Sequence, residues 1–221
     1  DRHVGFFNLR ADYRLGTRDE LRFQAGASEN STGAGFPGNA GNPLRTLEGG
    51  SSYAQLQWTR SYGPDEELRL SAYYQRETGQ ERFIIPTPVP GITIPVDAGH
   101  TTSRSNIELQ HTFQARPDMR VVWGLEARKD SVTSRQMFNT GDAQTTSLAR
   151  GFGNLEWRIH PLVLINAGGT LEHYSLTGTS LAPRLMANFQ PMAGQTLRVG
   201  VSKAYRTPSL AEQKGDVRYY Y

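Results

Sequence analysis

The sequence contains no cysteine, which excludes disulfide frameworks, zinc-finger spacings and thiol chemistry. It also has no run of about 18 consecutive apolar residues, the minimum for a membrane helix. Its mean hydropathy is −0.56 and its formal net charge is only +3. Basic and acidic residues alternate along the chain, so no nucleic-acid-binding stripe is predicted. A transmembrane β-barrel remains compatible, because only every second strand residue must then be apolar.

Strict alternation of apolar and polar residues is the dominant pattern. Leu68, Leu70, Ala72 and Tyr74 fall on one face of a strand, and Arg69, Ser71, Tyr73 and Gln75 fall on the other. The same split recurs along the chain and predicts about ten strands. They lie around residues 7–15, 21–25, 54–59, 68–75, 107–114, 120–128, 154–159, 163–172, 185–190 and 197–202.

The connections between these strands alternate in length. Tight turns are predicted at residues 16–19, 63–66, 116–118, 160–161 and 191–194, with longer loops at about 31–50, 84–100 and 139–146 and a short one near Gly178. The proline-rich stretch 83–96 predicts a stiff loop, because proline cannot donate to a β-ladder. Short turns at one end and long loops at the other are typical of outer-membrane barrels, with the turns periplasmic and the loops extracellular.

Aromatic residues occupy a regular place just before the tight turns. They are Tyr13, Tyr62, Phe113, Trp157 and Phe189. Side by side they would form a ring at one membrane edge, since amphipathic rings favour the headgroup level. The general preference of aromatics for strands gives the same pattern without a membrane.

The polar faces of the predicted strands carry both signs of charge. They hold Arg10, Arg14, Arg22, Arg69, Arg120, Arg128, Arg158 and Arg198, with Asp12, Glu108, Glu126, Glu156 and Glu172. In a barrel these residues face the lumen, and their number suits a wide barrel filled by water or a polar plug. In a soluble sandwich the same residues would form an ordinary solvated face.

Two stretches resemble the barrel of TonB-dependent outer-membrane receptors. The first runs out of the last predicted strand and consists of Tyr205, Arg206, Thr207, Pro208, Ser209, Leu210 and Glu212. It is similar to the family pattern Tyr/Phe-Arg-x-Pro-Ser/Thr-Leu-x-Glu. The second is the strand at 123–128 followed by Asp130. The resemblance implies an all-β fold, an antiparallel transmembrane β-barrel wall of about 10 strands out of about 22.

The resemblance also implies a partial domain and a function. Residues 1–221 contain no TonB box, plug domain or terminal aromatic strand, so we expect a partial barrel domain. The implied protein is a Gram-negative outer-membrane receptor that imports a scarce nutrient, such as a ferric siderophore or other metal chelate. Its expected partners are outer-membrane lipid, TonB acting through the missing plug, and the small-molecule chelate. No nucleic acid, cofactor, resident metal or catalytic residue is expected.

The motif near the end also has a physical interpretation. Pro208 is expected to end the hydrogen bonding of the last strand. Continued alternation places Tyr205 toward lipid near the outer edge and Arg206 toward the lumen. There Arg206 could join a structural ion pair, pair with plug carboxylates or contact an anionic ligand.

Loop residues supply the remaining candidates. Possible ligand contacts are Phe36, Asn39 and Asn42 in the first long loop, and Arg82 and Phe83 at the second. Two alternatives stay open: a ten-stranded outer-membrane barrel enzyme using Asp97 with His100, and a soluble β-sandwich that binds a ligand or partner. The stripe of Leu56, Trp58, Leu70, Val121, Trp123 and Ile165 distinguishes them, because it points outward in a barrel and into a dry core in a sandwich.

Overall fold

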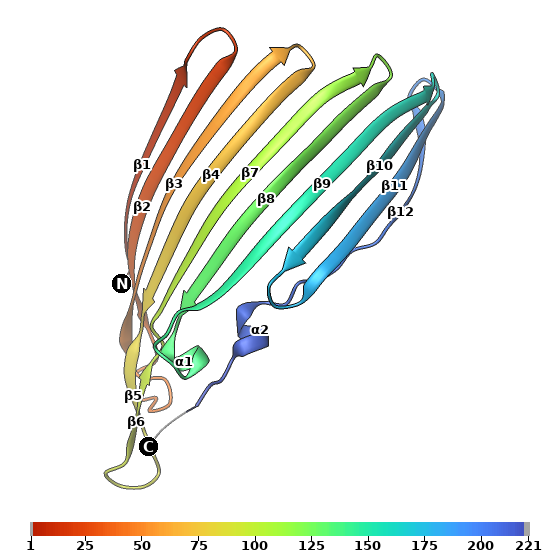
Figure 1. Cartoon of the computed structure of the whole chain (residues 1–221). Coiled ribbons are helices and arrows are strands. Elements are labelled where there is room, and N and C mark those ends of the chain that lie inside the picture. The colour runs from red at the N-terminus through yellow and green to blue at the C-terminus, as the bar shows by residue number, and fades with distance from the viewer. Residues whose placement is uncertain (1, 219–221) are drawn as a thin grey trace.

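A computed structural model describes residues 2–218 of the chain. Ten long strands form one antiparallel sheet in the order β1-β2-β3-β4-β7-β8-β9-β10-β11-β12, and β5 and β6 pair separately. Figure 1 shows the large sheet curving as a single layer, with both short helices and the small hairpin near the same end. All ten predicted strands are confirmed.

Nine of the ten strands of the large sheet are longer than the nine to eleven residues that cross a bilayer; β12 has eight. Their bounds are β1 Arg2–Arg14, β2 Asp19–Ala34, β3 Arg45–Gly63, β4 Glu66–Gln80, β5 Arg82–Pro86, β6 Thr93–Asp97, β7 His100–Arg116, β8 Met119–Thr133, β9 Gln144–His160, β10 Val163–Tyr174, β11 Gly178–Met192 and β12 Gln195–Ser202. Helix α1 spans Arg135–Phe138 and α2 spans Leu210–Lys214. Among residues 2–218, no helix is long and apolar enough to cross a membrane.

The connections separate into two ends, as predicted. At the turn end, two to four residues join β1 to β2, β3 to β4, β7 to β8, β9 to β10 and β11 to β12. At the loop end lie the longer connections, which include the β5–β6 hairpin and α1 (Figure 1). Gly194 has φ +79° in the last turn, a left-handed conformation that favours glycine.

Most of the large apolar strand side chains lie on one face, the outer face, and within residues 2–218 no second layer covers it. Leu56 is 46% exposed, and Leu70 and Trp123 are each 37% exposed. The register places Leu70 directly between Trp58 and Leu109, so apolar residues continue from strand to strand. The soluble-sandwich alternative is therefore wrong, since it requires this stripe to be buried in a dry core.

The opposite, inner face carries the charges, and many of them pair. Arg22 Nε lies 2.7 Å from Asp12 Oδ1, and Arg69 Nη2 lies 2.7 Å from Glu67 Oε1. Arg150 pairs across the strands with the buried Glu126. The exposed pairs among these contribute about 0.2–1 kcal/mol each, so they organise the face more than they stabilise the sheet.

The five aromatics predicted at the turn end lie near the tight turns. Two tryptophans there are anchored by aspartates of the same end. The Trp58 indole N–H donates to Asp19 Oδ1 at 3.0 Å, and the Trp157 indole N–H donates to Asp118 Oδ2 at 3.0 Å. An apolar ring with a hydrogen-bonded polar edge suits a membrane–water boundary.

Two of the predicted loops are partly strand. Strands β2 and β3 stay paired from Ser28–Ser51 out to Ala34–Arg45, so the loop predicted at 31–50 covers only residues 35–44. Residues beyond the bilayer need no apolar face, so the alternation that marks a strand in the sequence stops before the pairing does.

The stiff loop predicted at 83–96 is also wrong, because this stretch forms the β5–β6 hairpin. Pro86 pairs with Thr93 and Pro95 pairs with Ile84. A two-stranded hairpin has two free edges, where a residue without an N–H costs no ladder hydrogen bond. The third loop, predicted at 139–146, is residues 139–143, because β9 begins at Gln144.

Candidate functional site

The family-like segment folds into a capped helical turn at the loop end. Ser209 is the N-cap of α2: its hydroxyl accepts from the Glu212 N–H at 3.3 Å, and Glu212 accepts from the Ser209 N–H at 2.8 Å. This reciprocal capping box satisfies two N–H groups that a helix start leaves unpaired. The Ser-x-x-Glu spacing is therefore the local reason for α2, which we did not predict from the sequence.

Arg206 closes the same turn by pairing with Glu212. Its two terminal nitrogens lie 3.2 Å and 2.6 Å from the two carboxylate oxygens of Glu212. The Arg206 hydrogen bonds, followed by that from the Ser209 N–H, lower the pKa of Glu212 to about 2. The structure thus places Arg206 in an ion pair within its own segment. Of the three roles considered for Arg206, this is the structural ion pair.

Two expectations about this segment are corrected by the structure. Strand β12 ends at Ser202, so Pro208 does not end the strand; it precedes the N-cap of α2. Strand alternation consequently does not extend to Tyr205. The Lys203 ammonium lies 4.8 Å from the centre of the Tyr205 ring, a cation–π contact next to the segment's exit from the sheet.

Helix α2 lies beside α1 and β9 on the inner face, and its Leu210 is buried. Leu210 is 8% exposed, and Phe138 of α1, Leu148 of β9 and Tyr174 of β10 are also buried. These four are among the five buried hydrophobic residues of the described chain. Burying a leucine side chain is worth about 1.5–3 kcal/mol, which is one contribution to holding this segment against the sheet.

Polar contacts fasten α2 to the sheet and to α1. The Thr207 hydroxyl donates to Glu172 Oε1 at 3.2 Å, and the Lys214 ammonium lies 3.4 Å from Gln144 Oε1. The Asp216 N–H donates to the Met137 carbonyl at 2.8 Å. We call residues 203–216 the clasp, because they connect the end of β12 to β9, β10 and α1.

A hollow of about 590 Å³ lies under the clasp, on the inner face at the loop end. Its walls include Gln75, Glu77, Arg104, Arg128, Asp130, Met137, Tyr174 and the clasp residues from Arg206 to Glu212. Asp130 accepts from Arg104 at 2.6 Å and from Arg128 at 3.1 Å. Six of the seven motif residues line this hollow; Tyr205 does not.

The two candidate ligand loops meet through Arg45. Its Nε donates to Glu81 at 2.6 Å, its Nη1 donates to Asn42 Oδ1 at 2.5 Å, and its guanidinium carbon lies 4.3 Å from the centre of the Phe83 ring. Arg45 was missed because it was assigned to a loop. Its position at the first residue of β3 gives it access to both segments.

The other sequence candidates have the following places. The Phe36 ring is exposed, and the amide oxygen of Asn39 accepts from the Asn42 N–H at 3.0 Å within the loop. Arg82 pairs with Asp97 at 3.0 Å. None of the five loop candidates lines the hollow under the clasp.

Among the described residues, the Asp97 and His100 side chains named for the enzyme alternative do not come together as a catalytic pair. Asp97 also accepts from the Gly99 N–H at 3.0 Å, and within residues 2–218 no hydrogen bond joins it to His100. The His100 ring lies against Gly79 instead. Over the same residues, no group of three His, Cys, Asp or Glu side chains could hold a metal ion.

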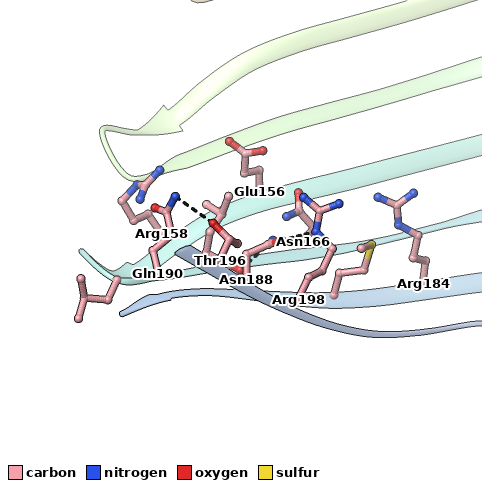
Figure 2. Close-up of a pocket in the computed structure, with 11 residues that line it drawn as sticks. Glu156, Arg158, Asn166, Arg184, Asn188, Gln190, Thr196 and Arg198 are labelled. Carbon is pink, nitrogen blue, oxygen red and sulfur yellow. Dashed lines mark hydrogen bonds between the residues drawn. The ribbon is translucent and has the colours of Figure 1, made fainter. Parts of the chain in front are cut away.

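A second hollow, of about 420 Å³, lies near the turn end of the inner face between β9 and β12. Figure 2 shows arginine, asparagine and glutamine side chains pointing into it. The inner face therefore has hollows at both the loop end and the turn end of the strands.

A family model described as TonB dependent receptor-like, beta-barrel matches residues 2–220. The chain belongs to the TonB-dependent receptors. Its ten-stranded antiparallel sheet is a section of their transmembrane barrel wall. A comparison with curated proteins found no match.

Solved receptor structures share the fold. The siderophore receptor PirA from Pseudomonas aeruginosa is 12% identical with a TM-score of 0.74, and the similarity covers 95% of this chain and 34% of that one. The ferric enterobactin receptor PfeA from the same organism (mutant G324V) is 12% identical with a TM-score of 0.78 and the same coverages. The ferric yersiniabactin uptake receptor FyuA from Yersinia pestis is 14% identical with a TM-score of 0.65, over 99% of this chain and 40% of that one.

The likeness at these identities is a likeness of fold. The TonB-dependent receptor section described above spans about a third of the PirA and PfeA chains.

Proposed function

We propose that this chain is part of an outer-membrane receptor that takes up a ferric siderophore or another metal chelate with energy supplied through TonB. The proposed partners are outer-membrane lipid at the outer face, the chelate at the loop end, and TonB acting through a plug domain. Residues 1–221 would supply part of the barrel domain. The observation that carries the proposal is the single-layer sheet of a TonB-dependent receptor, apolar outside and charged inside.

The loop end supports a role in ligand capture. Arg45 links Asn42 of the first loop to Phe83 of the hairpin segment, so two extracellular segments share one anchor. The hollow under the clasp lies at the same end and combines paired charges with apolar side chains. Pockets of a few hundred Å³ with such mixed linings are typical of small-molecule sites.

The solved relatives support the choice of ligand class. PfeA is named as a ferric enterobactin receptor, and mutants of it are described in complex with enterobactin. We extend the class, a ferric siderophore or similar chelate, to this chain as part of the proposal.

The test is uptake of radioactive iron by the complete receptor. It is expressed in a Gram-negative strain that lacks its own siderophore receptors, with and without TonB. Iron complexes of catecholate, hydroxamate and carboxylate siderophores are supplied separately. We expect uptake of at least one class, and only in cells with TonB. No uptake of any chelate, or equal uptake without TonB, would contradict the proposal.

A matched pair of variants tests the ligand face. Arg82→Ala removes an arginine from the loop-end hairpin, and Arg14→Ala removes one from the last residue of β1 at the turn end. We expect Arg82→Ala to weaken chelate binding to intact cells, with Arg14→Ala close to the unaltered receptor. Equal effects of the two variants would argue against capture at the loop end.

A further inference from the structure

The turn-end hollow contains three arginines, one from each of three strands. Arg158 lies on β9, Arg184 on β11 and Arg198 on β12, and all three line the same hollow of about 420 Å³. Figure 2 shows their guanidinium groups on the same side of the sheet as the single acid, Glu156. With one negative and three positive side chains, the lining has a formal charge of +2.

These arginines differ from several others on the inner face, which pair with a neighbouring carboxylate. Arg22, Arg69 and Arg104 each lie within about 3 Å of a carboxylate. Within residues 2–218, neither Arg158, Arg184 nor Arg198 has a carboxylate oxygen within 4.0 Å. Within the described part of the chain, the positive charge of this hollow is therefore offset only in part, by Glu156.

Their existing hydrogen bonds leave most of their donors unused. Arg198 Nε donates to Asn188 Oδ1 at 2.7 Å, and Arg158 Nη1 donates weakly to the Pro161 carbonyl at 3.4 Å. The register places Arg184 between Gly168 and Ser202, neither of which carries an acid. A guanidinium has five N–H donors in a fork that matches a carboxylate or a phosphate.

The rim of the hollow adds neutral hydrogen-bonding groups. Asn166, Asn188, Gln190 and Thr196 line the same hollow as the arginines (Figure 2). The Gln190 amide donates to the Thr196 hydroxyl at 3.4 Å, which holds these two side chains together. Such groups can donate to the outer oxygens of an anion whose central charge meets the arginines.

We propose that this hollow is an anion-binding site for a carboxylate- or phosphate-bearing solute inside the barrel. Arg184 and Arg198 supply the charge-assisted hydrogen bonds, Arg158 contributes charge at the turn end, and the amides orient the group. This site would make the transported solute, or a solute that passes with it through the barrel lumen, an anion. It rests on the proposed function only for the source of that solute.

The experiment measures binding directly and uses neither iron nor TonB. The complete receptor, purified in detergent micelles, is titrated with inorganic pyrophosphate by calorimetry at low ionic strength. We compare it with Arg184→Gln, Arg198→Gln, the double variant, and the control Arg69→Gln, which removes a paired inner-face arginine on β4. Because uptake is not measured, failure of the transport proposal would leave this result interpretable.

We expect each single variant to bind pyrophosphate at least tenfold more weakly, because each loses a charge-assisted contact. The double variant should not bind measurably, the control should match the unaltered receptor, and added salt should weaken binding. Arg184→Lys should recover part of the loss, since it restores the charge without the fork. Heat-modified gel mobility checks that each variant is folded. Absence of binding by the unaltered receptor, or equal affinity of the double variant, would overturn the proposal.

Discussion

The assignment of the two faces can be tested with one pair of adjacent substitutions. Ala72 and Ser71 are consecutive residues of β4, so an arginine at each points to opposite faces. Ala72 lies in register between Leu56 and Ile107 on the outer face, and Ser71 lies between Gln57 and Glu108 on the inner face. The two variants therefore share strand, depth and new side chain, and differ only in what the side chain meets.

The depth of Ala72 follows from the strand geometry. It is six residues from Glu66, where β4 begins at the turn end. At about 3.3 Å per residue and a tilt of about 40°, this distance is about 15 Å along the barrel axis. The apolar band of such a barrel is about 25 Å tall, which places Ala72 near its middle. An arginine there should cost about 2–4 kcal/mol.

Ser71→Arg should change stability by no more than about 1 kcal/mol. Its new charge faces the lumen and lies across from Glu108, a cross-strand pairing worth about 0.2–1 kcal/mol. The assay is guanidinium-induced unfolding of the complete receptor in phospholipid vesicles, followed by tryptophan fluorescence. Equal losses for the two variants, or a larger loss for Ser71→Arg, would refute the assignment of the faces.

Three further predictions concern the clasp and the turn end. Leu210→Ala should loosen the clasp, at a cost of about 2–3 kcal/mol for a buried leucine, and hydrogen exchange should become faster in residues 203–216 while exchange in β3 stays unchanged. The pKa of Glu212 is lowered to about 2 from the usual 4.5, so its contribution to the stability of the clasp is complete above about pH 4.5 and is lost as the pH falls toward 2. A carboxyl titration by NMR checks this pKa, and Arg206→Gln should raise it. Asp118→Asn should weaken the charge-assisted hydrogen bond of the Trp157 indole and red-shift or broaden its fluorescence, whereas Asp65→Asn, in a turn where no described tryptophan donates to it, should not.

The membrane-spanning part of the sheet could be predicted because strand residues that face lipid must be apolar, and this requirement leaves a regular pattern in the sequence. Every second residue of β4 and β8 must be apolar to face lipid. Leu70 and Trp123 therefore showed which residues of these two strands lie on the outer face. The tight turns were equally readable, since proline, glycine and aspartate favour them. This part of the fold was confirmed over all ten long strands.

The loop end was harder to predict because pairing there does not depend on lipid. Strands β2 and β3 continue past the membrane through serine, glycine and threonine, with the Ser28 and Ser51 hydroxyls 2.8 Å apart. The β5–β6 hairpin tolerates Pro86 and Pro95 because both strands are edges. Neither feature leaves an apolar–polar period in the sequence.

The candidate site was found in part through the family motif. The residues from Arg206 to Glu212 were singled out, and the Ser209-x-x-Glu212 spacing could have predicted the start of a helix. Nothing local in the sequence indicated that Leu210 would be buried beside α1 and β9, because these elements are distant in the chain. The pairing of Arg45 with Glu81 is equally non-local and was visible only in the folded chain.

The central claim is that β8 has lipid on one side and the aqueous lumen on the other. The direct measurement places one spin-labelled cysteine at a time at positions 121–128 of the complete receptor in bilayers. Accessibility to oxygen and to a water-soluble nickel complex is then recorded at each position. The account predicts oxygen maxima at Val121, Trp123, Leu125 and Ala127 and smaller oxygen signals at the even positions between them. Low accessibility of the odd positions to both reagents would contradict it, because those side chains would then lie in a dry protein core.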